Sequence, residues 1–143
     1  MVTRRNLLAA LTVAAAGVGL AGRAGAQSAA KNKVVFQVSD ADPKRWALAM
    51  NNIANVQDAM GRNNVAVELV VYGPGIGLLK FDSELSGRID DAIDRGVKVV
   101  ACENTMKAQK LTRNDMHPKI GYVPAGVVEL VEKQQQGWAY IRP

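Results

Sequence analysis

The single cysteine of this 143-residue chain, Cys102, stands where an apolar run meets a polar one, in the stretch VVACENTM (residues 99–106). The apolar run predicts a buried strand, and the residues after it predict the start of a helix. Unpaired N–H groups and the positive end of the helix dipole favour a thiolate over a thiol at such a position. Free cysteine is also among the most frequently buried residue types. The residues alone therefore leave two interpretations of Cys102 open, a reactive nucleophile and an inert core residue.

A glycine-rich stretch, GPGIG (residues 73–77), follows another apolar run and could bring backbone N–H groups to the same edge. It departs from the dinucleotide-binding pattern G-x-G-x-x-G because Leu78 stands where the last glycine belongs, and no G-K-[ST] sequence follows. We therefore predict a tight turn near Cys102, with Lys80 either adding positive charge there or lying in solvent. The residues predicted to bind substrate beside the catalytic Cys102 are Gly73, Gly75, Asn104 and Thr105.

His117 is the single histidine, and it precedes a predicted strand at residues 119–123. The connection that carries it enters the sheet from the amino-terminal edge, opposite to Cys102, so we expect a surface histidine rather than a general base for the thiol. One cysteine and one histidine do not supply a structural zinc site. We predict no metal and no organic cofactor. The mixed charges of residues 88–95 predict a solvated helix face.

Residues 1–26 have the pattern of an export signal. Arg4 and Arg5 precede an apolar run over residues 7–20, which is shorter than the roughly 20 residues that span a bilayer as a helix. The run is followed by AGA (residues 24–26), the small-x-small pattern of a signal-peptidase site. The paired arginines indicate a twin-arginine signal. An ordinary secretory leader and an uncleaved anchor are the alternatives, and we expect a periplasmic protein.

Removal of this leader changes the charge balance of the chain. The whole chain carries a formal net charge of +5, but the leader holds three arginines and no acid, so residues 27–143 carry 5 − 3 = +2. A nearly neutral domain without a basic block argues against a nucleic-acid-binding protein, and we expect no membrane association after cleavage. Because one cysteine forms no internal disulfide, Cys102 in an oxidising compartment is buried, paired between chains or kept as a reactive thiol.

Apolar runs and amphipathic segments alternate along residues 27–143, which we predict to form a single domain. The predicted strands cover residues 33–39, 65–72, 97–101, 119–123 and 138–142, and the predicted helices cover 43–60, 103–111, 125–136 and a segment capped by Asp82 or Ser83 that ends at Gly96. Connections of this length need crossovers. The predicted fold class is therefore α/β: an open doubly wound, mainly parallel sheet of about five strands with helices on both faces. Ligands bind beyond the carboxyl ends of such strands, where Cys102 is expected.

Three stretches, in this order, resemble the DsrE/DsrF-like family of small sulfur-handling proteins: VVYGPGIGLL, RGVKVVACENTM and GYVPAGVVELVEKQQQGWAYIRP. The resemblance covers essentially the whole chain after the leader, and it is strongest to the exported, stand-alone branch of the family. It implies a parallel α/β sheet and a homo-oligomer, a trimer or a hexamer. It also implies a persulfide on Cys102, which matches the cysteine of the element ACxNTM.

The residues and the resemblance together predict a sulfur carrier or sulfurtransferase-like protein of sulfur metabolism. Its partners would be a sulfane-sulfur donor and an acceptor thiol, each a small molecule or a protein. Two alternatives have the same fold. In one, the chain is a non-catalytic oligomeric binding or assembly module in which Cys102 is structural. In the other, Cys102 is a redox-sensing thiol that oxidises to sulfenic acid or forms a disulfide between chains.

Overall fold

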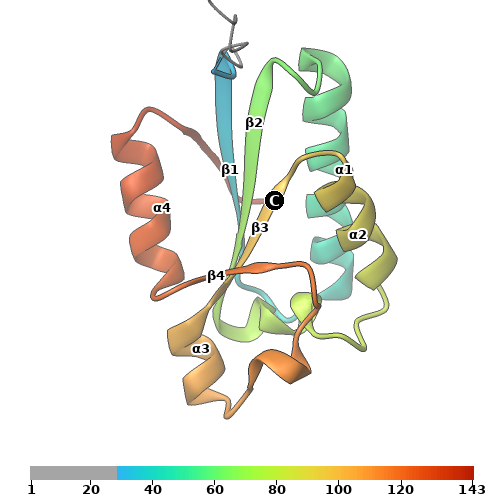
Figure 1. Ribbon diagram of the computed structural model, residues 1–143, viewed down its shortest axis with the longest axis vertical. Helices are drawn as coiled ribbons and strands as arrows, with labels where there is room; N and C mark the ends of the chain where they lie inside the picture. Colours follow the sequence, from blue (N-terminus) through green and yellow to red (C-terminus); the bar gives the residue numbers. More distant parts are fainter. Residues whose placement is uncertain (1–28) are drawn as a thin grey trace, which may run out of the picture.

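Five strands form one parallel sheet in the computed structural model, which describes residues 29–143 (Figure 1). The strands are β1 (Asn32–Val38), β2 (Val65–Val71), β3 (Lys98–Cys102), β4 (Gly121–Val123) and β5 (Ala139–Ile141). Their order across the sheet is β4-β3-β2-β1-β5, and each neighbouring pair is parallel. The predicted leader lies outside the described residues. The observed sheet confirms the predicted α/β fold class.

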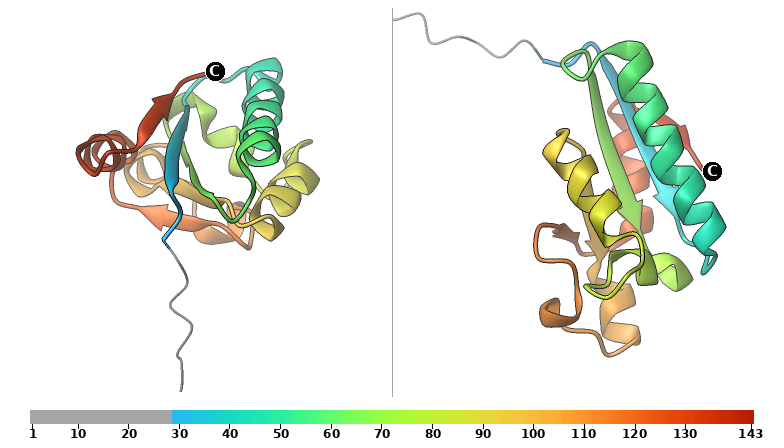
Figure 2. Two further views of the ribbon diagram at one scale, coloured as in Figure 1. Left: turned by 90° about the horizontal axis from the view of Figure 1, so that it is seen from above. Right: turned by 90° about the vertical axis from the view of Figure 1, so that its right-hand side faces the viewer.

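Helices cover both faces of this sheet, as predicted. They are α1 (Pro43–Met60), α2 (Ser86–Asp94), α3 (Glu103–Ala108) and α4 (Gly126–Gln135), together with the 3-10 segments η1 (Gly73–Leu79) and η2 (Arg113–Asp115). Helices α1 and α2 lie on one face and α4 on the other, whereas α3 lies beyond the carboxyl ends of the strands (Figures 1 and 2). None of the described helices combines the length and the apolar character needed to cross a bilayer.

The two faces have separate hydrophobic cores because strand side chains alternate between them. The larger core lies under α1 and α2, where Phe36 and Leu69 are fully buried. The smaller core lies under α4 and contains Val35, Val70, Val100, Val123 and Leu130, with Tyr72 and Trp138 packed against it. Burial on both faces is the reason that β2 reads as an almost uninterrupted apolar run.

Several element boundaries differ from the prediction. Residues 73–79 form a 3-10 helix rather than a single tight turn, because their backbone packs against the end of β1. Helix α2 begins at Ser86 rather than after Asp82 or Ser83, and no side chain caps it. Ser83 instead accepts the Leu85 N–H within a preceding turn, at 3.3 Å. Strand β3 extends to Cys102, and the last predicted strand and helix are each shorter by a residue at both ends.

Glu68 is a fully buried carboxylate on the face of β2 that α4 covers. The Lys133 ammonium of α4 lies 3.0 Å from it and that of Lys98 lies 3.4 Å away, and Lys133 also pairs with Glu129 at 3.5 Å. Burial raises the pKa of Glu68, while the two ammonium groups act in the opposite direction. A buried charge is tolerated only when it is paired. This cluster therefore ties α4 to β2 at one place and in one orientation.

We expect Lys133→Met to lower the free energy of unfolding by about 3 kcal/mol, because the buried Glu68 carboxylate then keeps only the more exposed Lys98 as its cationic partner. Adding Glu68→Gln to that variant removes this charge and should recover part of the loss. Lys119→Met is the matched control, because Lys119 pairs with Asp90 at the surface, where an ion pair contributes little. Urea titrations followed by circular dichroism measure all three variants. Equal losses for Lys133→Met and Lys119→Met would contradict the role given to the cluster.

Candidate functional site

Cys102 is the last residue of β3 and the residue that caps the start of α3, as the sequence predicted. Its backbone is extended, with φ −76° and ψ 116°, so the helix begins only at the next residue. The Cys102 sulfur accepts a hydrogen bond from the Thr105 N–H at 3.4 Å. The thiol thus takes the place of a serine or aspartate side chain at a helix N-cap and satisfies one of the free N–H groups of the first turn.

A second helix begins beside the same sulfur. Strands β3 and β4 are neighbours, with Cys102 opposite Val123, and α4 starts shortly after β4. The connection is tied to α3 because the Asn104 N–H donates to the Pro124 carbonyl at 3.1 Å. The N–H of Gly126, the first residue of α4, also acts on the thiol and lowers the pKa of Cys102. The starts of two helices therefore converge on one thiol.

Polar groups around Cys102 act on its ionisation. The sulfur lies 4.0 Å from the Pro124 carbonyl oxygen, to which the neutral thiol donates. Burial by itself raises the pKa of the Cys102 thiol, but the Thr105 side chain and the N–H groups of Gly126, Thr105 and Asn104 outweigh it. Together they lower the pKa of Cys102 below the ordinary thiol value. Donors aimed at a charged sulfur stabilise the thiolate, which is the nucleophilic form. The arrangement is therefore suited to nucleophilic or group-transfer chemistry at sulfur.

Thr105 links the glycine-rich segment to the thiol. The Gly73 N–H donates to the Thr105 hydroxyl oxygen at 2.9 Å, and the Thr105 N–H donates in turn to the Cys102 sulfur. The Thr105 side chain also lowers the pKa of the Cys102 thiol. Gly73 has φ +56°, a left-handed conformation that glycine adopts without strain, and its carbonyl accepts from the Gln109 side chain at 3.2 Å. Three of the predicted site residues, Gly73, Thr105 and Cys102, are thus joined in one chain of hydrogen bonds.

The other two residues predicted to bind substrate have their N–H groups engaged. The Gly75 N–H donates to the Ser39 carbonyl at 3.1 Å. A side chain at Gly75 would place its Cβ 2.8 Å from the Val38 carbonyl oxygen, so this glycine allows η1 to pack against the end of β1. Asn104 lies at the site with an exposed side chain. Contacts of these residues with a substrate stay predictions.

Cys102 is buried, with 5% of its surface exposed. The residues around it are not buried to the same degree, because Asn104 and Pro124 are both exposed. The sulfur therefore lies one residue beneath the surface, between the first turns of α3 and α4. Access of a reagent to the sulfur is therefore easiest if these two turns open locally. Such opening is less costly at exposed turns than in a packed core.

His117 is buried, with 3% of its surface exposed, so the prediction of a surface histidine was wrong. The connection between α3 and β4 folds back onto η1, where the His117 N–H donates to the Leu79 carbonyl at 2.8 Å. Its Nδ1 accepts the Lys119 N–H at 3.3 Å, and its Nε2 lies 3.5 Å from the Asp90 carboxylate. Both ring nitrogens are therefore engaged away from Cys102, and His117 has a structural role.

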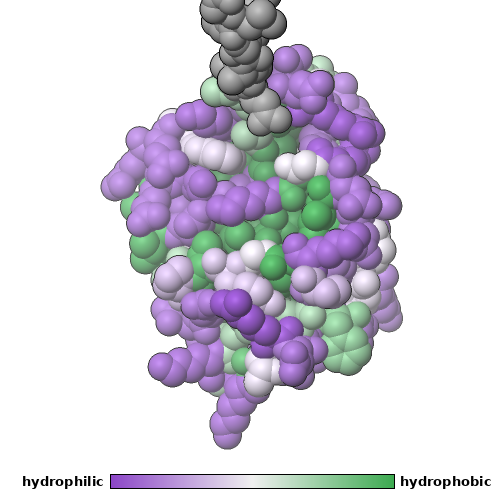
Figure 3. Space-filling view, in the orientation of Figure 1, coloured by the Kyte–Doolittle hydropathy of each residue, from purple (hydrophilic) through white to green (hydrophobic). Residues whose placement is uncertain are grey.

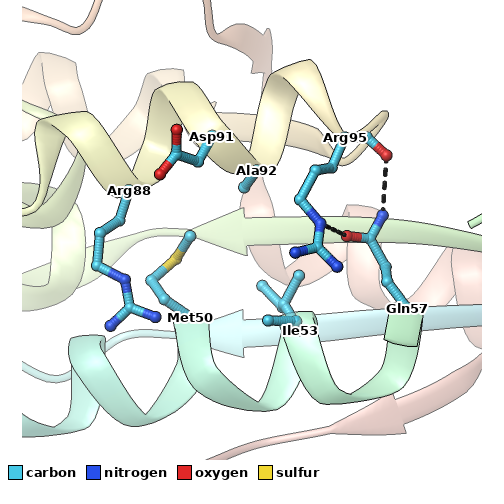
Figure 4. A pocket seen from close by; sticks show the side chains of 8 residues that line it. Met50, Ile53, Gln57, Arg88, Asp91, Ala92 and Arg95 are labelled. Atoms are coloured by element: carbon cyan, nitrogen blue, oxygen red, sulfur yellow. Dashed lines mark hydrogen bonds between the residues drawn. The ribbon is translucent and has the colours of Figure 1, made fainter. Parts of the chain in front are cut away.

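A cavity of about 120 Å³ lies between α1 and α2, on the face of the sheet away from α4 (Figure 4). Two arginines of the α2 region reach across it: Arg88 donates to the Asn51 side chain at 2.7 Å, and Arg95 donates to the Gln57 side chain at 3.1 Å. The prediction of a solvated charged face was therefore wrong for these arginines. These arginines join α1 to α2, and the cavity is a gap in the packing between the two helices. Within residues 29–143, no group of three or more side chains of the metal-binding types could hold a metal ion.

We expect iodoacetamide to alkylate Cys102 with a pH–rate midpoint below that of a free thiol, because a lowered pKa leaves more thiolate at neutral pH. Thr105→Val removes one donor and should shift the midpoint to higher pH, slowing alkylation at neutral pH by about tenfold, the low end of the effect of a hydrogen bond to a charged group. Thr105→Ser keeps the hydroxyl and serves as the control. Equal pH–rate profiles for the valine and serine variants would show that the Thr105 hydroxyl does not lower the pKa of Cys102.

The DsrE/DsrF-like family model matches residues 32–143, which include every strand and helix described above. Protein MTH1491 of Methanobacterium thermoautotrophicum, a protein of unknown function, has 35% sequence identity and a TM-score of 0.75, and the match covers 78% of this chain and 99% of that one. No curated protein matches this chain.

Two further solved structures share the fold at low identity. BT1422 of Bacteroides thetaiotaomicron, a conserved protein of unknown function, is 14% identical with a TM-score of 0.62, over 78% of this chain and 95% of that one. The ychN protein of E. coli is 9% identical with a TM-score of 0.63, over 80% of this chain and 100% of that one. The family model covers most of the chain and the parallel sheet agrees with it, so the chain belongs to the DsrE/DsrF-like family.

Proposed function

We propose that this protein is a sulfur carrier or sulfurtransferase that holds a persulfide on Cys102. The observation that carries the proposal is the convergence of two helix starts on a lone thiol that accepts the Thr105 N–H, with surrounding polar groups that lower its pKa. Membership of the DsrE/DsrF-like family supports it. An inert core cysteine would need none of these donors, because a neutral thiol is only a weak hydrogen-bond acceptor.

The proposed reaction is two displacements at sulfur. The Cys102 thiolate attacks the sulfane sulfur of a donor such as thiosulfate or a polysulfide. A new S–S bond forms on Cys102, the S–S bond of the donor breaks, and sulfite or a shortened polysulfide leaves with the electron pair. An acceptor thiolate then attacks the outer sulfur of the persulfide, and the Cys102 thiolate is released. The donors that stabilise the thiolate also stabilise it as the leaving group of this second step. Neither displacement calls for a metal or an organic cofactor.

We also propose that the protein works in the periplasm as a homo-oligomer, a trimer or a hexamer. The sequence pattern of residues 1–26 supports export. The outer side of α4 supports assembly, because Val127, Val128 and Val131 are 56%, 49% and 48% exposed at neighbouring helix positions. Figure 3 shows apolar atoms along the outer margin of this helix. Burying such an apolar stripe between subunits is favourable. The same stripe favours the alternative function, an assembly module in which Cys102 is structural.

The first test is to incubate the protein with thiosulfate or polysulfide and to measure its intact mass. We expect a gain of one sulfur atom that reductant reverses and that is absent from Cys102→Ser. After addition of a small acceptor thiol, the protein should lose this sulfur atom and the acceptor should gain it. An unchanged mass over a range of donors would rule out the carrier. A covalent dimer that reductant dissolves would instead favour the redox-sensing thiol.

The second test concerns the valine stripe. Val127→Lys combined with Val131→Lys places two charges in the proposed interface and should reduce the molar mass measured by light scattering to that of a monomer. Leu48→Lys is the control, because Leu48 is exposed on α1 and outside the stripe. A molar mass that both variants leave unchanged would exclude α4 as the interface.

A further inference from the structure

Tyr72 and Gly126 are in unusually close contact. A Cβ built on Gly126 would lie 2.9 Å from Tyr72 Cδ1, 3.0 Å from Tyr72 Cβ and 3.1 Å from Tyr72 Cγ. These distances are shorter than van der Waals contact allows. The atoms concerned are at the base of the ring and at Cβ, close to the Tyr72 backbone. Position 126 is therefore a place where any side chain displaces either Tyr72 or the start of α4.

Tyr72 has little freedom to move. It follows β2 directly, its N–H donates to the Val38 carbonyl at 3.1 Å, and its carbonyl accepts the Gly75 N–H at 3.2 Å. Tyr72 is partly buried and packs against the smaller core. Displacing the ring would open a gap in this core, and core packing resists such gaps.

The body of α4 is held as firmly. Leu130 is buried in the smaller core, and Glu129 and Lys133 belong to the ionic cluster at Glu68. The residues of α4 before Glu129 lack these restraints, because Val127 and Val128 are exposed and the cap residue, Ala125, makes no side-chain hydrogen bond. A clash at Gly126 is therefore relieved most easily there. Gly126 itself carries the N–H that lowers the pKa of the Cys102 thiol.

We propose that the contact between Tyr72 and Gly126 sets the distance from the start of α4 to the Cys102 sulfur, which makes both residues positioning residues for the thiol. Tyr72 acts as the stop against which the first turn of α4 rests, and the missing side chain at position 126 lets its N–H reach the sulfur. This inference rests on the proposed function only in treating Cys102 as the working group of the site.

The test is the pH–rate profile of Cys102 alkylation, together with thermal unfolding. Gly126→Ala should withdraw the N–H, move the profile to higher pH and slow alkylation at neutral pH several-fold. It should also lower the melting temperature, although alanine is the better helix former. Gly87→Ala is the matched control: Gly87 lies in the first turn of α2 with open space around it. That variant should keep the wild-type profile with an unchanged or higher melting temperature.

A second comparison does not depend on the folding of Gly126→Ala. Tyr72→Ala removes Cγ and Cδ1 of the ring. A Cβ at position 126 would then have only the Cβ of residue 72 close to it, at 3.0 Å, and an adjustment of a few tenths of an ångström relieves that contact. Tyr72→Ala alone should move the profile to higher pH because the stop is lost. The double variant Tyr72→Ala/Gly126→Ala, in which the new methyl group rests against the remaining Cβ, should lie closer to wild type than Tyr72→Ala does.

The outcomes separate this inference from the proposed function. A wild-type profile for Gly126→Ala, or a double variant shifted further than Tyr72→Ala, would overturn the positioning role even if the wild-type protein forms a persulfide. If the pH–rate profiles of the variants shift as expected but the wild-type protein gains no sulfur from any donor, the carrier function is overturned and the positioning role stands.

Discussion

The pairing of β3 with β4 is the constraint on which the site depends. Each strand is followed closely by a helix, and their parallel pairing, with Cys102 opposite Val123, brings the starts of α3 and α4 to one point at the sheet edge. A register shift of one residue would turn the Cys102 side chain to the other face of the sheet. Val100 and Val123 lie in the smaller core and Ala101 in the larger one, so burial on both faces opposes that shift.

The ionic cluster at Glu68 complements this pairing by orienting α4. Only Gly126 and Leu130 of this helix are buried, which is a small apolar anchor for ten residues. Buried ion pairs add little to stability compared with apolar packing, but an unpaired buried charge is costly, so they exclude alternative arrangements. Here, pairing Lys133 with Glu68 selects one rotation of α4. The same rotation turns the valine stripe outwards.

Burial and ionisation of Cys102 oppose each other, and the structure balances them locally. A sulfur with 5% exposure would ordinarily stay protonated, because a low-dielectric surrounding disfavours charge. The polar groups of Thr105, Gly126 and Asn104 act in the opposite direction, and the pKa of the Cys102 thiol lies below its ordinary value.

Much of this architecture could be predicted from the chain itself. Alternating apolar and amphipathic segments predict a parallel α/β sheet, and the junction at Cys102 predicts a thiol at its carboxyl edge, because both signals are local periodicities. The 3-10 form of η1, the uncapped start of α2, the burial of His117 and the donor at Gly126 were not predictable in this way. Each depends on contacts between segments far apart in the chain: η1 with the end of β1, His117 with Leu79, and Gly126 with Tyr72. Residue types and spacing thus placed a thiol at the edge of the sheet, and only tertiary packing decided which groups surround it, since hydrogen bonds and steric contacts act through space.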